Sequence, residues 1–298
     1  MFSGCTSISS ILDLRAIMIC SQGCFRMYKG CSSLTSVHIL PATIIGQNGY
    51  SYMFQNCTSL TTVQKLSASM LDKECCSYMF NGCSSLTAAP ELPATTLAYS
   101  CYSYMFENCT SLTTAPELPA TILEYYCYSN MFKGCSSLTA APELPATRLA
   151  DGCYGYMFQN CTSLTTAPEL PATTLANFCY SYMFNGCTSL TDAPELPATT
   201  LARGCYSYMF QNCTSLTTAP ELPATKFVTN CYNYMFNGCS RLNRIKAMFT
   251  ATPSTTYTNN WVNGVSSSGT FIKNSAASWN VTGVSGVPSG WTIQYASE

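Results

Sequence analysis

Twenty cysteines are the residues of this chain whose type and spacing suggest chemistry, because thiols form disulfides and bind zinc. Most fall into two ladders with a spacing of 26 residues, from Cys5 to Cys239 and from Cys75 to Cys231. Within a unit the ladders are 8 residues apart, about 12 Å on a helix, which exceeds the reach of a disulfide. Zinc requires close pairs of ligands, and the one histidine, His38, has no such pair beside it. We therefore expect buried, unreactive thiols that pack as small apolar residues.

Six glutamates form a further row with the same spacing, each within an Ala-Pro-Glu-Leu-Pro segment. If these segments stack at the spacing of strands, adjacent carboxylates repel each other by about 1 kcal/mol in water. Such a row either recruits Ca²⁺, which prefers oxygen ligands, or remains a solvated stripe whose carboxylates splay apart. We treat the row as a candidate binding site and assign no metal to it. Its members are Glu91, Glu117, Glu143, Glu169, Glu195 and Glu221.

The C-terminal segment differs in composition from the rest of the chain. Residues 250–298 contain no cysteine and all three tryptophans, with much Ser, Thr, Asn and Gly. We expect residues 248–298 to form a β-rich cap on the last repeat unit, or else a small carbohydrate-binding or attachment module. Trp261, Trp279 and Trp291 are accordingly candidate binding residues.

Recurring tyrosine pairs, such as Tyr102 and Tyr104, suggest stacking on sugars. At the edge of an apolar stripe, however, such tyrosines are more typical of packing residues with a hydrated hydroxyl. Catalysis is not indicated, because the chain has a lone histidine, no G-x-S-x-G motif, no Gly-rich phosphate loop and no paired acid–base carboxylates. We expect neither enzymatic activity nor a cofactor.

One repeat unit must position all of these residues. Met-Phe pairs recur every 26 residues from Met53 to Met235, the chain opens on another such pair, and Met27-Tyr28 occupies the remaining position. Ten units in one register therefore cover residues 1–247. A fixed period of this length is typical of a solenoid, in which each unit buries its apolar face only by stacking on its neighbours.

Within a unit, the apolar spacing predicts a helix followed by a strand. Leu97, Cys101, Met105 and Cys109 fall at i, i+4, i+8 and i+12, a helical stripe that directs Ser103 to solvent. The residue before each cysteine of the first ladder is always Gly or Asn, types that adopt the left-handed conformation at the end of a helix. The following Leu-Thr-Thr-Ala segment is compatible with a strand, which two prolines limit to about 3–5 residues.

Charge and hydropathy exclude several classes of partner. Charged residues make up 9% of the chain and the net charge is −1. The chain therefore lacks the clustered basic residues that bind nucleic acid or an anionic membrane surface. No apolar run of about 18 residues predicts a membrane span. No signal-peptide pattern is visible. We expect a piece of a longer protein, export by a route that leaves no signal, or a virion component.

The motif Met-Phe-x-x-Cys-x-Ser-Leu-Thr, followed by a proline-rich turn, resembles the BspA-like leucine-rich repeat family and the related Met-Phe repeat of bacterial surface proteins. The resemblance covers residues 1–247. It implies an α/β fold, a leucine-rich-repeat-like solenoid of ten 26-residue units with a short parallel strand and a short helix in each, closed by a small β-rich cap. This sequence departs from the family in its strand, where Ala115-Pro116-Glu117 replaces apolar residues. Similar repeats, with a closing module like Gly286–Trp291, are found in proteins of gut bacteria and their phages.

The resemblance implies a non-catalytic protein at the cell surface or outside the cell. Such a protein would bind a host or bacterial surface protein or glycan through many weak contacts along its extended face. The alternative is a structural or receptor-binding component of a phage particle. Neither function involves nucleic acid or membrane insertion, and the oligomeric state stays open. We expect a partner to be selected at the positions that vary between units, such as Thr96, Tyr99, Ser100 and Glu107, or at the tryptophan-bearing tail.

Overall fold

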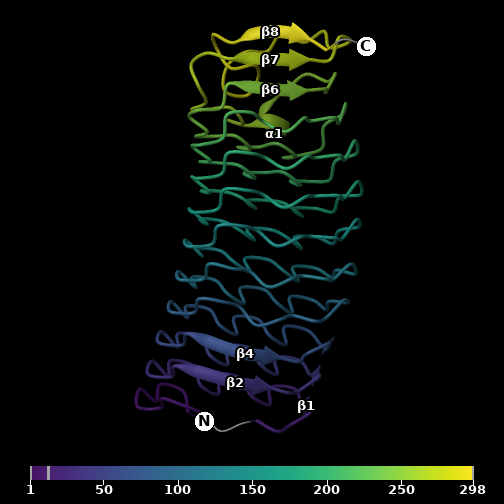
Figure 1. The fold of residues 1–298 in the computed structure, drawn as a ribbon. Coiled ribbons are helices and arrows are strands. Elements are labelled where there is room, and N and C mark those ends of the chain that lie inside the picture. Colours follow the sequence, from purple (N-terminus) through teal and green to yellow (C-terminus); the bar gives the residue numbers. More distant parts are fainter. Residues whose placement is uncertain (1, 12–13, 297–298) are drawn as a thin grey trace.

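A computed structural model describes residues 2–11 and 14–296 of the chain. The backbone winds into a straight stack of about 11 turns with repeats about 26 residues apart, and the N- and C-terminal regions lie at opposite ends (Figure 1). The solenoid architecture predicted from the period is confirmed. The stack continues past residue 247, because two further strands lie on it. The division at that residue stays a prediction.

All of the paired strands are parallel, and each lies one turn of the stack from its neighbour. They form a sheet in the order β1-β3-β5, a sheet β2-β4, and a sheet β6-β7-β8 at the C-terminal end. The strands are β1 (Met18–Ile19), β2 (Ser36–Leu40), β3 (Ile44–Ile45), β4 (Thr62–Leu66), β5 (Met70–Leu71), β6 (Arg244–Ala247), β7 (Thr270–Lys273) and β8 (Thr292–Tyr295).

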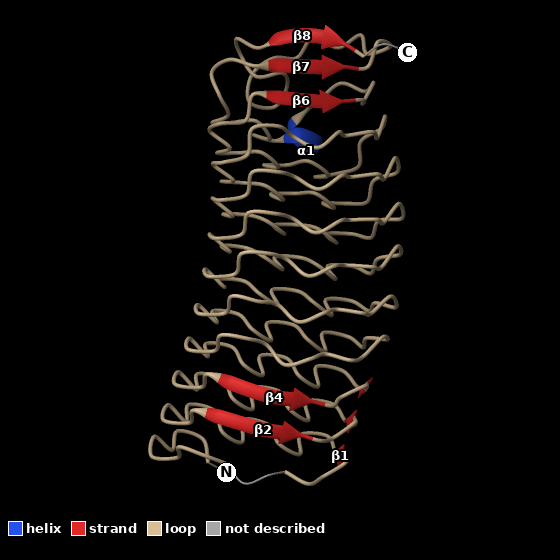
Figure 2. Ribbon diagram, in the orientation of Figure 1, coloured by secondary structure: helices blue, strands red, loops and turns tan. Residues whose placement is uncertain are grey.

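Prolines weaken the strand in the middle of the stack. The segments equivalent to β2 and β4 carry Pro116 and its counterparts, which have no N–H to donate to a ladder. There the pairing is reduced to isolated parallel bridges, such as those of Ala88 with Thr114 and of Thr166 with Asp192. The strand position therefore persists through the middle of the stack as isolated bridges from Ala88 to Arg244, and regular strands lie near the two ends (Figure 2).

The prediction of a short helix in each unit is wrong. Among residues 2–11 and 14–296 the one helix is α1 (Thr255–Thr258), which Ser254 caps through its hydroxyl. The segment from Leu97 to Cys109 instead forms consecutive turns, in which every fourth residue is left-handed: Ser100, Tyr104 and Asn108 have φ of 50°, 58° and 60°. A turn motif that repeats every four residues gives the same apolar spacing as a helix, which explains the error.

Backbone hydrogen bonds in this segment alternate between two partners. The N–H of Tyr102 donates to the carbonyl of Cys127 at 3.0 Å, and that of Tyr104 donates to the carbonyl of Ser129 at 2.9 Å, each in the next unit. The N–H of the intervening residue, such as Met105, donates back to the carbonyl of Tyr102 at 3.2 Å. Each unit is thus joined to the next by a row of backbone bonds, which satisfies polar groups that burial would otherwise penalise.

Equivalent side chains stack on one another to form the core. The rings of Phe106 and Phe132 have their centroids 5.7 Å apart with planes 4° apart, and the same contact recurs along the stack. Methionines and leucines such as Met105 and Leu112 are fully buried beside them. Ser103 is also buried, at 5% exposure, although the helical pattern directed it to solvent. It donates a hydrogen bond to the carbonyl of Ser129 instead.

The predicted left-handed Gly and Asn positions are confirmed, and their alternation has a packing reason. Asn108 has φ of 60° and the next residue of its row, Gly134, has φ of 75°. A Cβ placed on Gly134 would lie 2.4 Å from the side-chain oxygen of Asn108. The asparagine side chain thus occupies the space above the following unit, which favours glycine there.

We predict that Phe132→Ala destabilises the protein by about 3–5 kcal/mol, because it leaves a cavity in a fully buried stack. The free energy of unfolding is measured by urea titration. Thr121→Ala, at an exposed position of the same unit, serves as the control and is expected to change it by less than about 0.5 kcal/mol. A cost below about 1 kcal/mol for Phe132→Ala would contradict a continuous ring stack.

Candidate functional site

The glutamate row lies on the face of the stack that carries β2 and β4. In the register of these strands Ile39 pairs with Lys65, and Glu91 occupies the position equivalent to Lys65 in the next unit. All six glutamates are exposed. At the C-terminal end of the row, Lys246 of β6 places its Nζ 2.8 Å from the carboxylate of Glu221. The row of carboxylates is therefore flanked by Lys65 and Lys246.

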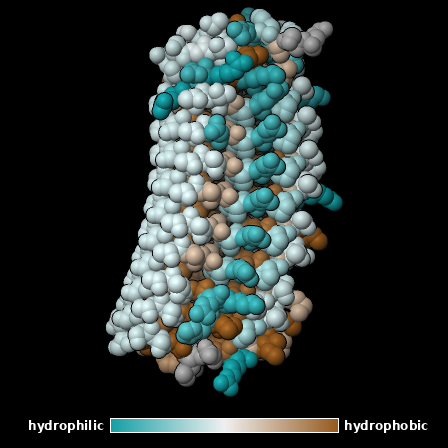
Figure 3. All heavy atoms as spheres, viewed as in Figure 1, coloured by the Kyte–Doolittle hydropathy of each residue, from teal (hydrophilic) through white to brown (hydrophobic). Residues whose placement is uncertain are grey.

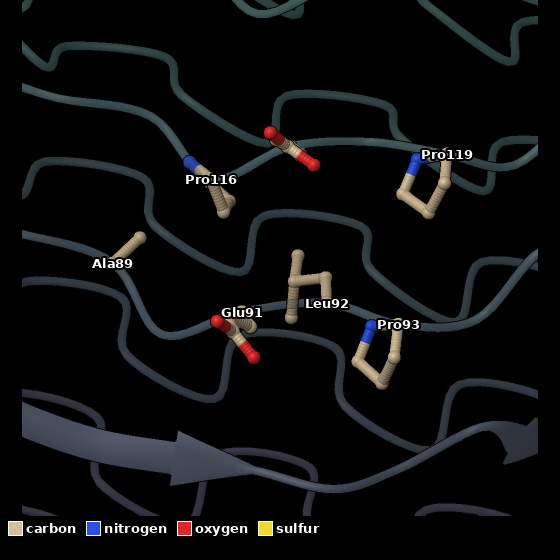
Figure 4. Close-up of a pocket in the computed structure, with 7 residues that line it drawn as sticks. Ala89, Glu91, Leu92, Pro93, Pro116 and Pro119 are labelled. Carbon is tan, nitrogen blue, oxygen red and sulfur yellow. The ribbon is translucent and has the colours of Figure 1, made fainter.

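Shallow grooves separate successive units on this face. One of about 470 Å³ is lined by Glu91, Leu92 and Pro93 of one unit and by Pro116 and Pro119 of the next (Figure 4). The same groove recurs between later units, with volumes of about 460, 350 and 330 Å³. Because the prolines make no ladder bonds, neighbouring segments leave this space open. Figure 3 shows a column of hydrophilic side chains along this face, beside paler and more apolar ones.

The acidic face offers hydrogen-bond acceptors at regular intervals rather than a metal cage. Within residues 2–11 and 14–296, no three His, Cys, Asp or Glu side chains come together in a way that could hold a metal ion. Carboxylates that succeed one another at about 4.8 Å instead form a linear negative stripe, with the proline-lined grooves between four of the five adjacent pairs. Such a surface suits a partner that brings several basic groups in an extended arrangement.

The cysteines are free thiols, as predicted, and eighteen of the twenty are buried; Cys5 and Cys20 are exposed. The cysteines of the first ladder also form hydrogen bonds between units. The thiol of Cys135 donates to the carbonyl of Phe106 in the preceding unit at 3.1 Å, and this contact recurs along the ladder. Sequence reasoning missed this role, although the constant offset of three residues between the Phe and the Cys fixes the geometry.

Burial keeps these thiols protonated. It raises the pKa of Cys187 and of Cys57 from the ordinary value of 9.0 to about 12, and that of Cys231 to about 11. Backbone hydrogen bonds offset part of this rise. A protonated thiol is a donor and a poor nucleophile, so the buried cysteines of the ladder link successive units and are unreactive.

The tyrosines occupy two different environments. Tyr102 is fully buried and its hydroxyl has no hydrogen-bond partner, so the expected hydrated hydroxyl is absent at this position. Tyr104 is half-buried and its ring stacks on Tyr78 with centroids 4.3 Å apart. Tyr78 thus covers one face of the Tyr104 ring. The packing role predicted for the pair therefore describes the structure, and a sugar cannot reach Tyr102.

All three tryptophans of the tail lie in the interior. Trp261, Trp279 and Trp291 are 0%, 4% and 7% exposed. Their indole N–H groups donate to backbone carbonyls, for example that of Trp261 to Gly286 at 2.9 Å. Trp261 covers the end of the phenylalanine stack, with its ring 6.1 Å from that of Phe236. These rings present no open face, and we do not include them in the proposed binding surface.

Comparisons with known proteins identify one family. A family model described as BspA type leucine rich repeat region matches in 6 copies, over residues 1–113, 50–191 and 153–268. No curated protein matches the chain. A leucine-rich repeat protein from Bacteroides ovatus is 16% identical, with 97% of this chain and 94% of that one covered and a TM-score of 0.29. A leucine rich cell surface protein from Faecalibacterium prausnitzii is 16% identical, with 98% and 87% covered and a TM-score of 0.32. In the described part of the chain, no helix is long and apolar enough to cross a membrane.

We predict that a thiol reagent modifies two cysteines of the native protein quickly, Cys5 and Cys20, and the eighteen buried ones only on unfolding. The reason is that burial both shields the sulfur atoms and suppresses the thiolate. Mass spectrometry after alkylation, with and without denaturant, assigns the modified sites. The variant Cys5→Ser/Cys20→Ser is the control and should lose the fast phase entirely. Rapid modification of Cys109 or Cys135 in the native protein would contradict the buried ladder.

We also predict that the protein loses stability as the pH rises from about 9 towards 12. In the unfolded chain the thiols ionise near 9.0, whereas in the folded chain those of Cys57, Cys187 and Cys205 hold their protons to about 12. The folded state therefore binds more protons in this window, so its stability is complete below pH 9 and declines above it. Thermal unfolding in a pH series measures the effect. An unchanged melting temperature from pH 9 to 12 would refute it.

Proposed function

Because this chain belongs to the BspA-type leucine-rich repeat family, we propose that it is a non-catalytic repeat protein displayed at a cell surface, which binds a partner through its acidic face. The observation that carries the proposal is the repetition of one groove. Glutamates are exposed at the same position of six consecutive units, and proline-lined grooves of about 330–470 Å³ lie between four of the five adjacent pairs.

Repetition gives such a face its affinity. A single exposed carboxylate paired with a basic side chain contributes little, because water and salt screen the interaction. Once one such contact forms, the next basic group of the same partner is held close to the next carboxylate, and its binding becomes intramolecular. Several weak contacts then act together, and the affinity rises with the number of units that the partner spans.

The chemistry of the face favours a basic, extended segment of a protein as the partner. The carboxylates accept hydrogen bonds from Lys and Arg, and the grooves between them, lined by Pro93, Pro116 and Pro119, receive the apolar stems of those side chains. The flanking lysines, Lys65 and Lys246, limit the acidic stripe to the middle of the stack, which sets the length of partner that it accommodates.

We predict that Glu143→Gln/Glu169→Gln weakens binding of oligolysine peptides about three- to tenfold, because two exposed charge pairs are lost while the shape of the groove is retained. Isothermal titration at low salt, with peptides of increasing length, measures the affinity. It should increase with peptide length for the wild-type protein and less so for the variant.

The control for this experiment removes two negative charges elsewhere. Glu74→Gln/Glu124→Gln changes the net charge equally and leaves the row intact. If this control weakens binding as much as the row variant, the attraction comes from net charge and the acidic face is not the site. Affinity that does not depend on peptide length would contradict the avidity argument.

A further inference from the structure

Three consecutive units, those of Cys127, Cys153 and Cys179, depart from the pattern of the turn segment at neighbouring positions. At the position two residues after the cysteine of the second ladder, Gly155 stands where six other units carry serine. These serines are Ser51, Ser77, Ser103, Ser129, Ser181 and Ser207. At the next position of the unit, where tyrosine rings stack on one another, Asn130 replaces a tyrosine. Tyr104 and Tyr156 therefore belong to separate stacks. At the position that precedes the cysteine, the aromatic residues Tyr126 and Phe178 flank Gly152.

These departures open a slot in the surface. A pocket of about 160 Å³ is lined by Tyr126, Gly152, Gly155, Tyr156 and Phe178, together with two serines. Gly155 has no side chain to fill the space that a serine fills in other units. Tyr126 is 44% and Phe178 is 37% exposed. They lie two units apart, a separation of roughly 9–10 Å at the spacing of strands, which admits one ring in contact with both.

The two aromatic rings lean in the same direction along the stack. A Cβ on Gly152 would lie 2.4 Å from Cε1 of Tyr126, and a Cβ on Gly204 equally close to Cε1 of Phe178. Each ring therefore leans over the glycine of the next unit. Arg203 lies over the ring of Phe178, 5.6 Å from its centroid. Phe178 is thus supported on that side and is displaced away from the slot.

The polar groups of the slot are matched to a ligand that both accepts and donates hydrogen bonds. The hydroxyl of Ser129 accepts from the side-chain nitrogen of Asn130 at 2.9 Å, which leaves its own proton available. The hydroxyl of Ser181 donates to the carbonyl of Ser207 at 3.2 Å, which leaves its lone pairs available. No charged side chain lines the pocket.

We propose that this slot binds one neutral sugar ring of a glycan. A pyranose presents an apolar C–H face to an aromatic ring and hydroxyls at its edge, the combination that Tyr126 and Phe178 offer together with Ser129 and Ser181. The volume is below the 300–1,000 Å³ typical of sites for whole small molecules, so the ligand is one residue of a longer chain. The slot shares no residue with the acidic face. It is therefore a separate site, and its test does not depend on the function proposed above.

The decisive variant is Gly155→Ser, which restores the serine that six other units carry at this position. Gly155 is not among the glycines with positive φ, and a Cβ there would lie 3.3 Å from the carbonyl oxygen of Gly152. Serine therefore needs a shift of a few tenths of an ångström, and we expect the melting temperature to change by only a few degrees. A second variant, Phe178→Asn, removes one wall and introduces the residue that Asn230 supplies at the equivalent left-handed position. Ser77→Gly is the control, because it removes a serine in a unit that has no aromatic walls.

The experiment is a glycan array of neutral oligosaccharides, followed by saturation-transfer NMR with the free hexoses and N-acetylhexosamines found at the ends of the glycans that bind. The wild-type protein and Ser77→Gly should bind with equal affinity, and both Gly155→Ser and Phe178→Asn should bind at least tenfold more weakly. Absence of glycan binding by the wild type would overturn the proposal. Undiminished binding by Gly155→Ser would overturn it as well, as would capture of aromatic peptides in preference to every glycan.

Discussion

The exchange of backbone hydrogen bonds between successive units is the constraint on which the rest of this structure depends. Every second N–H in the turn segment is committed to a carbonyl of the next unit, as that of Tyr102 is to Cys127. The alternation requires a left-handed residue at every fourth position, and at Tyr104 that conformation costs about 1–2 kcal/mol. Stacking of Tyr104 on Tyr78, at 4.3 Å, contributes about 0.5–1.5 kcal/mol and so offsets a comparable amount.

The same constraint explains why the units are so similar. Each residue has its own equivalent directly above and below it, so a side chain must pack against copies of itself. Phenylalanine rings pack on one another in parallel stacks. Each cysteine thiol of the first ladder instead donates a hydrogen bond to the carbonyl of the phenylalanine one unit back, as that of Cys135 does to Phe106. Side chains that cannot pack against their own copies alternate with glycine, as Asn108 does with Gly134 and Tyr126 does with Gly152.

The sequence predicted the solenoid and its period because periodic burial is directly visible in residue types. It did not distinguish turns from a helix, since Cys101, Met105 and Cys109 have the spacing of both. The left-handed φ of Asn108 was predictable from its alternation with glycine, whereas that of Tyr104 was not, because tyrosine rarely adopts it. The exposure of the glutamates followed from their charge, because carboxylates are almost never fully buried unless they are paired. The burial of Trp261 depends on how the tail folds back over the last turn, and no local pattern specifies that.

Periodicity also limits what the surface can recognise. A face built from identical units, such as the row from Glu91 to Glu221, presents the same subsite many times and is suited to avidity rather than to the choice of one ligand. Selectivity for a single group requires a unit that differs from its neighbours. Gly155 is such a departure, and it coincides with exposed aromatic rings at Tyr126 and Phe178. A Cβ on Gly155 would lie 3.3 Å from the carbonyl oxygen of Gly152, which requires only a small shift of the backbone, and six other units accommodate serine at this position.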